Sequence, residues 1–256
     1  MRTEHRMVHP EKFEEIPKSA FKWRFASIEK APRGAVKRCL IFDVANILYG
    51  NNQQCSKTGF VPDVRNLLAV MQFYVYNDFE VIGIILHKYV KEFETNYHQA
   101  IQELIKHRLL HVVNKFALDD KFAMELASQI DGVVLTCDKF ADHRSQEDIY
   151  DQICRGNHVR MYGNSVKPSF QYTRTSCGQH FASGSHFDID PTSWSKFFTL
   201  PSNPRFEIAE EQRCNWTPER RVFVLNLLEK LIVTSFQDVP KNIALVHEER
   251  AIMNLS

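Results

Sequence analysis

The sequence predicts an α/β protein in which a parallel sheet of about five strands is covered by helices on both faces. Short apolar runs recur along the chain, and each is short and continuous enough to be a buried strand. Between these runs lie segments whose apolar residues follow helical spacing. Strands that alternate with helices pair in parallel, because a parallel connection needs a crossover.

The first strand is expected in the stretch Cys39–Gly50, an apolar run that stops at Asp43 and has Asn46 three positions later. A polar loop follows at 51–59, and Pro62 and Asp63 then open a helix. Further strands are predicted at 80–86, around 111–113, at 132–136 and at 158–162, and helices at 62–75, 92–108, 119–130 and 146–154.

The chain is expected to divide into three parts. Residues 1–37 form a basic N-terminal extension, since ten Lys and Arg but only five Glu and no Asp lie in the first 38 positions. Residues 38–200 form the α/β domain, of which 163–200 looks loop-like. Residues 201–256 form a C-terminal helical extension, whose main helix begins at Thr217-Pro218-Glu219 with an N-cap residue, a proline and an acid.

Composition narrows the classes of protein. The six cysteines are scattered without a C-x-x-C pair, which favours a reducing compartment. The N-terminus lacks the apolar segment of a signal peptide, and no apolar run reaches the length of a membrane span. We therefore expect no membrane association and a location in the cytoplasm or the nucleus. The net charge of +1 excludes a generic polycation, so nucleic-acid contacts must come from local basic patches.

Acidic residues occur where buried strands end or helices begin. They are Asp43, Asp119, Asp120, Asp138 and Asp142. In a doubly wound sheet these points lie along one edge, where the acids would repel one another unless a cation neutralised them. Oxygen donors without a histidine or thiolate pair suit Mg²⁺ or Mn²⁺ better than zinc, and a phosphodiester is the natural substrate. Taken alone, each helix-start Asp is more often an N-cap, and Asp131-Gly132 is interpreted as a turn outside the site.

These residues carry a resemblance to a known family. The pattern Asp43-x-x-Asn46, Asp119-Asp120-Lys121-Phe122 with its helix, and Thr136-x-Asp138-x-x-x-Asp142 resembles the NYN/PIN-like ribonuclease domain of the Regnase-like (MCPIP-type, CCCH zinc-finger-associated) family. The resemblance covers roughly residues 38–200. It implies a PIN-like fold, single-stranded or looped RNA as substrate, and a homo- or heterodimer through the nuclease domain.

The resemblance also implies roles for individual residues in a Mg²⁺-dependent endoribonuclease site. Asp43, Asp120 and Asp138 would bind the metal, while Asn46, Asp119 and Asp142 would position the attacking water and outer-shell ligands. The family's Gly-Ser between the first Asp and the Asn is Val44-Ala45 here, the basic loop before the double Asp is shortened, and the CCCH zinc-finger ligands are missing. RNA selection would then depend on Arg144, Lys88 and Lys91, on the basic arm or on a partner protein.

Two other enzyme classes fit the sequence poorly. Phe42-Asp43-x-x-Asn46 is superficially similar to HAD-type phosphotransferases, but Ala45 occupies the place of their second acid. No G-x-G-x-x-G or P-loop follows the first strand, which argues against a nucleotide-cofactor enzyme. The remaining alternative is a catalytically weak RNA-binding or scaffold module of a ribonucleoprotein complex, with partners bound through the C-terminal helix. The sequence favours a nuclease of mRNA turnover or RNA silencing, because it keeps the full set of acids.

Overall fold

The computed structural model describes most of the chain between residues 30 and 237. The described residues are 30–49, 62, 64–92, 94–95, 97–114, 119–140, 148–163, 173–174, 180–181, 187–189 and 191–237. Among the predicted features, the N-terminal arm up to residue 29, the loop at 51–59, Asp142 and Arg144 lie outside this set.

A six-stranded sheet forms the centre of the protein, with the strand order β4-β3-β2-β5-β6-β9. The strands are β2 (Leu40–Asp43), β3 (Val81–Leu86), β4 (Leu110–Val113), β5 (Val133–Thr136), β6 (His158–Gly163) and β9 (Phe187–Ile189). The first five are parallel, and β9 pairs antiparallel with β6. The α/β fold class and its five parallel strands are therefore confirmed.

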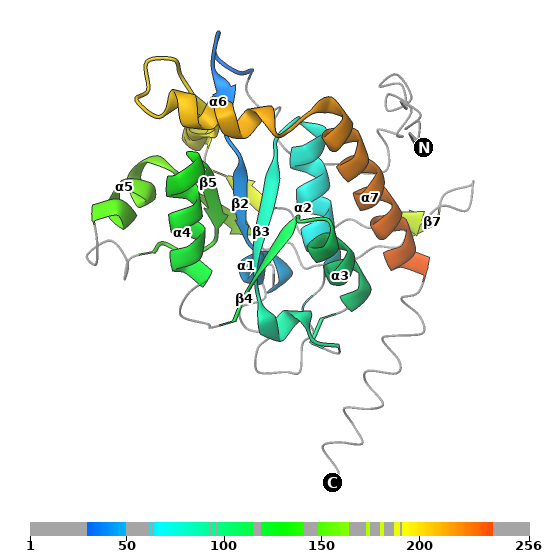
Figure 1. Cartoon of the computed structure of the whole chain (residues 1–256). Coiled ribbons are helices and arrows are strands. Elements are labelled where there is room, and N and C mark those ends of the chain that lie inside the picture. Colours follow the sequence, from blue (N-terminus) through cyan, green and yellow to red (C-terminus); the bar gives the residue numbers. More distant parts are fainter. Residues whose placement is uncertain are drawn as a thin grey trace, which may run out of the picture.

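Helices cover both faces of this sheet (Figure 1). They are α1 (Val44–Tyr49), α2 (Val64–Tyr76), α3 (His98–Lys106), α4 (Asp119–Ile130), α5 (Asp148–Gly156), α6 (Phe206–Cys214) and α7 (Pro218–Gln237), with 3₁₀ helices η3 (His87–Val90) and η5 (Pro191–Phe197). Two small sheets join β1 (Val36–Lys37) to β10 (Phe198–Thr199) and β7 (Thr173–Arg174) to β8 (His180–Phe181).

The central strand β2 explains why both faces need a cover. Leu40 and Phe42 pack into the larger core beneath α2 and α7, while Ile41 packs into the core beneath α4 and α5. All three side chains are fully buried. Alternate residues of a strand point to opposite faces, so a strand covered on both sides must be continuously apolar. This requirement produces the apolar run that the sequence shows.

The order of the strands reverses between β2 and β5. From β2 the chain adds β3 and then β4 on one side, and it later adds β5 and β6 on the other. At such a reversal the connections leave in opposite directions, and a crevice opens at the carboxyl ends of the strands. Asp43 ends β2 and Thr136 ends β5, so both residues lie at this switch point.

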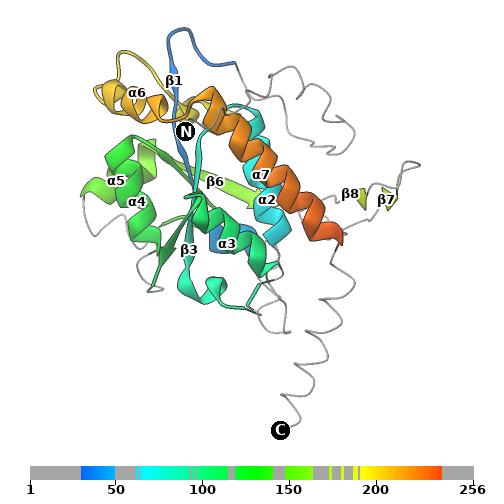
Figure 2. The same ribbon diagram turned by 45° about the vertical axis from the view of Figure 1, so that its right-hand side comes forward.

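The C-terminal helices pack on the same domain. Helix α7 lies along α2 in both views (Figure 2), and its Val224 and Leu228 are fully buried in the larger core. The apolar face of this helix, which the sequence left open to packing or to a partner, is thus used in packing. The boundary predicted at residue 200 remains a prediction.

Arginines attach these C-terminal helices to the domain. Arg213 of α6 pairs with Asp78 at 2.6 Å. In α7, Arg220 donates to the His107 carbonyl at 2.6 Å and Arg221 to the Tyr76 carbonyl at 2.7 Å. Within the described residues, no helix has both the length and the apolar composition that crossing a membrane requires.

Some elements differ from the prediction. Helix α1, which was not predicted, begins directly after Asp43, because Ile47 and Leu48 are fully buried in the core and the chain must coil to place them. Helix α3 starts at His98 rather than near residue 92, since Tyr97 adopts the left-handed conformation at φ 71°. Helix α6 was not predicted, and the loop-like region contains the short elements β9, η5 and β10.

Candidate active site

Asp43 lies at the switch point with its carboxylate held in one orientation. Only 8% of the residue is exposed. The Thr136 hydroxyl donates to Asp43 Oδ2 at 2.7 Å, and the Asn46 side-chain amide donates to the same oxygen. The Asn46 backbone N–H points at Asp43 Oδ1 over a longer 3.4 Å. Asp43 therefore caps α1 and also presents a fixed carboxylate at the edge of the sheet.

Thr136 connects this carboxylate to a second acid. Its hydroxyl accepts from the Asn46 amide at 3.0 Å and from the Asp138 backbone N–H at 3.1 Å while it donates to Asp43. The Asp138 carboxylate in turn accepts from the Phe140 N–H at 2.9 Å, which closes a turn. Thr136 is fully buried and its hydroxyl makes three hydrogen bonds, so it fixes Asp43 and the start of the Asp138 loop together.

The charge at this edge is poorly balanced. Burial raises the pKa of Asp43 most strongly, the hydrogen bonds from Thr136 and Asn46 lower it, and the nearby charge of Asp119 raises it again. Within the described residues, no lysine or arginine forms an ion pair with Asp43. The folded protein thus carries a carboxylate that would gain from an added cation.

The thiol of Cys137, which follows Thr136, is affected by the same excess of negative charge. The pKa of this thiol is raised to about 11, mainly by burial; the charges of Asp43 and Asp138 also raise it, and Arg160 opposes them. The thiol is therefore protonated at neutral pH and is unsuited to metal binding or nucleophilic attack. The same effects show that both carboxylates lie close to Cys137.

The predicted acids come together only in part. Asp43, Asn46 and Asp138 are joined through Thr136, and Asp119 acts on Asp43 through its charge. Asp119 and Asp120 form the first turn of α4 and are both partly exposed. Among the described residues, no group of three or more His, Cys, Asp and Glu side chains is arranged to hold a metal ion. The triad of Asp43, Asp120 and Asp138 stays a prediction, as does the role of Asp142, which is not described.

Two of the predicted cations, Lys88 in η3 and Lys91 directly after it, lie at the same end of the sheet. Lys88 and Lys91 follow β3 directly after its carboxyl end at Leu86, and both are exposed. The Lys88 ammonium lies 4.6 Å from the Tyr89 ring centroid. Their position is compatible with contact to a phosphate, and their role in RNA binding remains a prediction.

Sequence reasoning missed two residues of this site. Thr136 was recognised in the motif but given no role, although a hydroxyl ending a buried strand beside a buried acid is a usable signal. Arg160 pairs with Thr136 across β5 and β6, and its Nε donates to the Cys137 carbonyl at 3.2 Å. Only the strand register reveals that this cation lies beside the acids.

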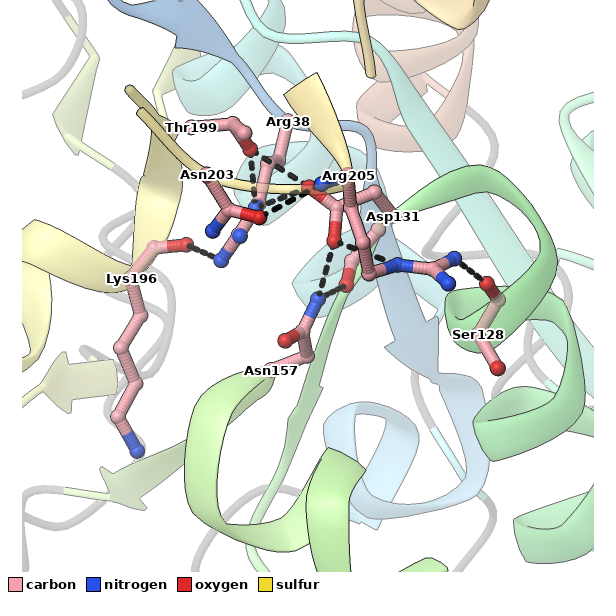
Figure 3. Close-up of polar contacts among 9 residues, drawn as sticks. Arg38, Ser128, Asp131, Asn157, Lys196, Thr199, Asn203 and Arg205 are labelled. Carbon is pink, nitrogen blue, oxygen red and sulfur yellow. Dashed lines mark hydrogen bonds and ion pairs between the residues drawn. The ribbon is translucent and has the colours of Figure 1, made fainter. Parts of the chain in front are cut away.

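A second buried aspartate lies at the opposite end of the same strands. Asp131 is fully buried and binds Arg38 at 2.9 Å and Arg205 at 3.2 Å (Figure 3). It also accepts from the Thr199 hydroxyl at 2.6 Å and from the Asn157 amide at 3.3 Å. Asp131 is in the predicted turn, with φ 50°, but no sequence pattern indicated its two arginine partners.

The fold and the acids at its switch point define a class of α/β proteins with an acidic site at the carboxyl edge of a parallel sheet. The chain belongs to the family described as the Zc3h12a-like Ribonuclease NYN domain, which matches residues 36–174, more than half of the sequence. The predicted resemblance is thereby confirmed. The match contains every predicted acid and ends before α6.

Comparison with other proteins adds little to this assignment. No curated protein matches the chain in sequence. The solved structures that match include nuclear protein-only RNase P 2 (PRORP2) of Arabidopsis thaliana, at 15% sequence identity and a TM-score of 0.43. That match covers 60% of this chain and 29% of PRORP2, so the chain spans less than a third of that protein's length.

Proposed function

We propose that this protein is a divalent-metal-dependent endoribonuclease that hydrolyses single-stranded or looped RNA at the Asp43 edge of the sheet. The observation that carries the proposal is a buried carboxylate, rigidly oriented at the switch point, whose charge no described lysine or arginine balances. Burial of an unpaired carboxylate costs free energy, and a bound divalent cation would offset that cost. Membership of a ribonuclease family supplies the substrate class.

The donors at this edge fit Mg²⁺ or Mn²⁺ in kind. All are carboxylate oxygens, and Asp43, Asp120 and Asp138 would hold the ion. Mg²⁺ usually keeps several waters and takes only one or two carboxylates together with substrate phosphates, so a complete protein cage is not needed. When bound, the ion polarises the phosphoryl oxygen and stabilises the charge that develops on it.

The residues of the chain orient the reaction. Asn46 and Thr136 hold Asp43 in place, and Asp119 and Asp142 would position the water that attacks phosphorus. One carboxylate at this edge takes up the proton that the water loses. The bond between phosphorus and the 3′ oxygen breaks, and the leaving oxygen takes up a proton. The products carry a 5′-phosphate and a 3′-hydroxyl.

Cations around the acids would bind the RNA backbone. Lys88, Lys91 and Arg160 lie at the same end of the sheet, and Arg144 lies in the segment after Asp138. A few such contacts position the strand without sequence preference. Target choice in mRNA turnover or RNA silencing would then come from a dimer partner or a ribonucleoprotein component. Because the apolar face of α7 is buried, such a partner would bind its outer side.

The proposal is tested with labelled single-stranded RNA and the purified full chain. Wild type with Mg²⁺ should cut internally and leave 5′-phosphate ends, whereas Asp43→Asn should lose at least about 100-fold in rate, and EDTA should abolish cleavage. Glu103→Gln on α3, which removes an exposed carboxylate away from this edge, is the matched control and should cut like wild type. Equal cleavage by wild type and Asp43→Asn would refute the assignment, and RNA binding without cleavage would favour the scaffold alternative.

A further inference from the structure

An aromatic pair lies at the open edge of the sheet, beside α4. The His111 and Phe122 rings are 6.5 Å apart between centroids, with their planes at 38°. Phe122 is 38% exposed, and His111 is exposed as well. In the part of the chain that the structure describes, β4 pairs only with β3, so this pair borders an unpaired strand edge.

Both rings lie on the face of the sheet that α4 covers, and the first turn of α4 contains Asp119 and Asp120. His111 alternates along β4 with Leu110, which packs into the core beneath α2, and it shares its face with Val113, which packs toward the α4 core. The buried side of α4 consists of Ala123, Met124 and Ala127. Phe122 therefore lies on the flank of α4, and its exposed ring adds nothing to the interior of the core.

The position of Phe122 on its helix places it next to the proposed site. Residues three apart are neighbours on a helix surface, so Phe122 lies beside Asp119 in the first turn of α4. Asp119 is the residue whose charge acts on Asp43. A group bound against Phe122 is thus adjacent to the acids that are proposed to act on the phosphodiester.

A second phenylalanine provides a comparison. Phe223 of α7 is 41% exposed and contacts His107 at 4.9 Å between centroids, so it repeats the pairing of phenylalanine with histidine. The Arg220 guanidinium lies 5.5 Å from the Phe223 ring centroid. Among the described residues, no such cation lies over the Phe122 ring. His107 also precedes β4, which puts the Phe223 pair at the other end of that strand.

We propose that Phe122 and His111 form a stacking site for one unpaired nucleobase of the RNA, next to the phosphate that is cut. The inference rests on the proposed ribonuclease function and specifies how its substrate is held. The acids at this edge repel a phosphate wherever no cation screens them, so a contact with the uncharged face of a base is favoured here. Stacking on an aromatic ring accepts any base, and it requires a base that is not paired in a duplex.

The test measures RNA binding by the full chain in EDTA, where cleavage does not interfere. The probe is a single-stranded oligonucleotide with 2-aminopurine at successive positions, because stacking quenches its fluorescence. Phe122→Leu should weaken binding about five-fold or more and remove the quenching at one position. Phe122→Trp should retain both, and Phe223→Leu, the matched control, should bind like wild type. With Mg²⁺, Phe122→Leu should raise KM more than it lowers kcat.

The outcomes separate this inference from the proposed function. If wild type cuts RNA but Phe122→Leu binds and quenches as wild type does, the stacking site is refuted and the nuclease assignment stands. If Phe122→Leu changes the oligomeric state in size-exclusion chromatography without changing RNA affinity, the pair is a protein contact and the inference also fails. If wild type neither binds nor cuts RNA, both proposals fail.

Discussion

Asp43 and Asp131 are buried aspartates at opposite ends of the same two central strands. Asp131 precedes β5 and is neutralised within the protein by Arg38 and Arg205. Asp43 ends β2 and, among the described residues, accepts hydrogen bonds from the neutral groups of Thr136 and Asn46. A buried carboxylate therefore has a different role at each end of the strands. At the amino ends of the strands the buried charge joins distant segments, and at the carboxyl ends it remains available to an external cation.

Removing Asp131 should have the largest effect on stability. Asp131→Ala leaves the buried Arg38 without its carboxylate and should lower the free energy of unfolding by about 3–5 kcal/mol. Urea denaturation measures the loss. Asp151→Ala, which breaks an exposed pair with Arg155 at 2.8 Å, is the control and should cost no more than about 1 kcal/mol. Equal losses in the two variants would show that the Asp131 pairs do not stabilise the fold.

Thr136→Val should have an intermediate effect. Loss of the hydroxyl removes a donor from Asp43 and an acceptor from the Asn46 amide and the Asp138 N–H, at a cost of about 1–3 kcal/mol in stability. The reoriented Asp43 should also lower kcat more than it raises KM. Thr136→Ser keeps the hydroxyl and should restore most of both properties. A serine variant as inactive as the valine variant would count against the orienting role.

Arg160→Gln should produce a smaller change, confined to RNA binding. If this guanidinium contacts a phosphate, its removal should weaken binding to all sequences alike and reduce the slope of log Kd against log salt concentration by about 1. Fluorescence anisotropy over a salt series measures the slope. Arg155→Gln, which alters an exposed arginine of α5, should leave it unchanged. An unchanged slope in Arg160→Gln would exclude the phosphate contact.

The pH dependence of stability should show the smallest effect. Because the folded pKa of Asp43 is raised, folded protein holds this proton to higher pH than unfolded chain does, and the contribution of Asp43 to stability falls as pH rises above 3.8 through the folded value. In EDTA, Asp43→Asn lacks this loss, so its stability relative to wild type should increase over that interval. Thermal unfolding at several pH values measures the difference, and a constant difference would contradict the raised pKa.

The sequence was sufficient to place Asp43, because an apolar run that ends in an acid is a local signal. Alternation of such runs with amphipathic segments was likewise enough to predict the parallel sheet. The partners were not predictable in the same way. Arg205 lies far from Asp131 in the chain, and Arg160 lies beside Thr136 only through the register of β5 and β6. Ion pairs and register depend on tertiary packing, which leaves no periodic trace in the sequence.

The start of α1 shows a similar limit. Asn46 was predicted as a site residue from the Asp43-x-x-Asn46 spacing, without a helix at this position. It occupies the first turn of α1 and donates to Asp43 from both its backbone and its side chain. Local propensity favours a turn at asparagine, whereas burial of Ile47 and Leu48 requires a helix. Tertiary packing therefore makes this segment helical, and the helix orients the Asn46 amide toward Asp43.

Calorimetric titration with Mn²⁺ at neutral pH tests most directly whether Asp43, at the carboxyl end of the strands, binds a divalent cation. Wild type should bind the ion, Asp131→Asn should bind it with similar affinity when the protein remains folded, and Asp43→Asn should bind at least about ten-fold more weakly. Equal binding by wild type and Asp43→Asn would contradict the account.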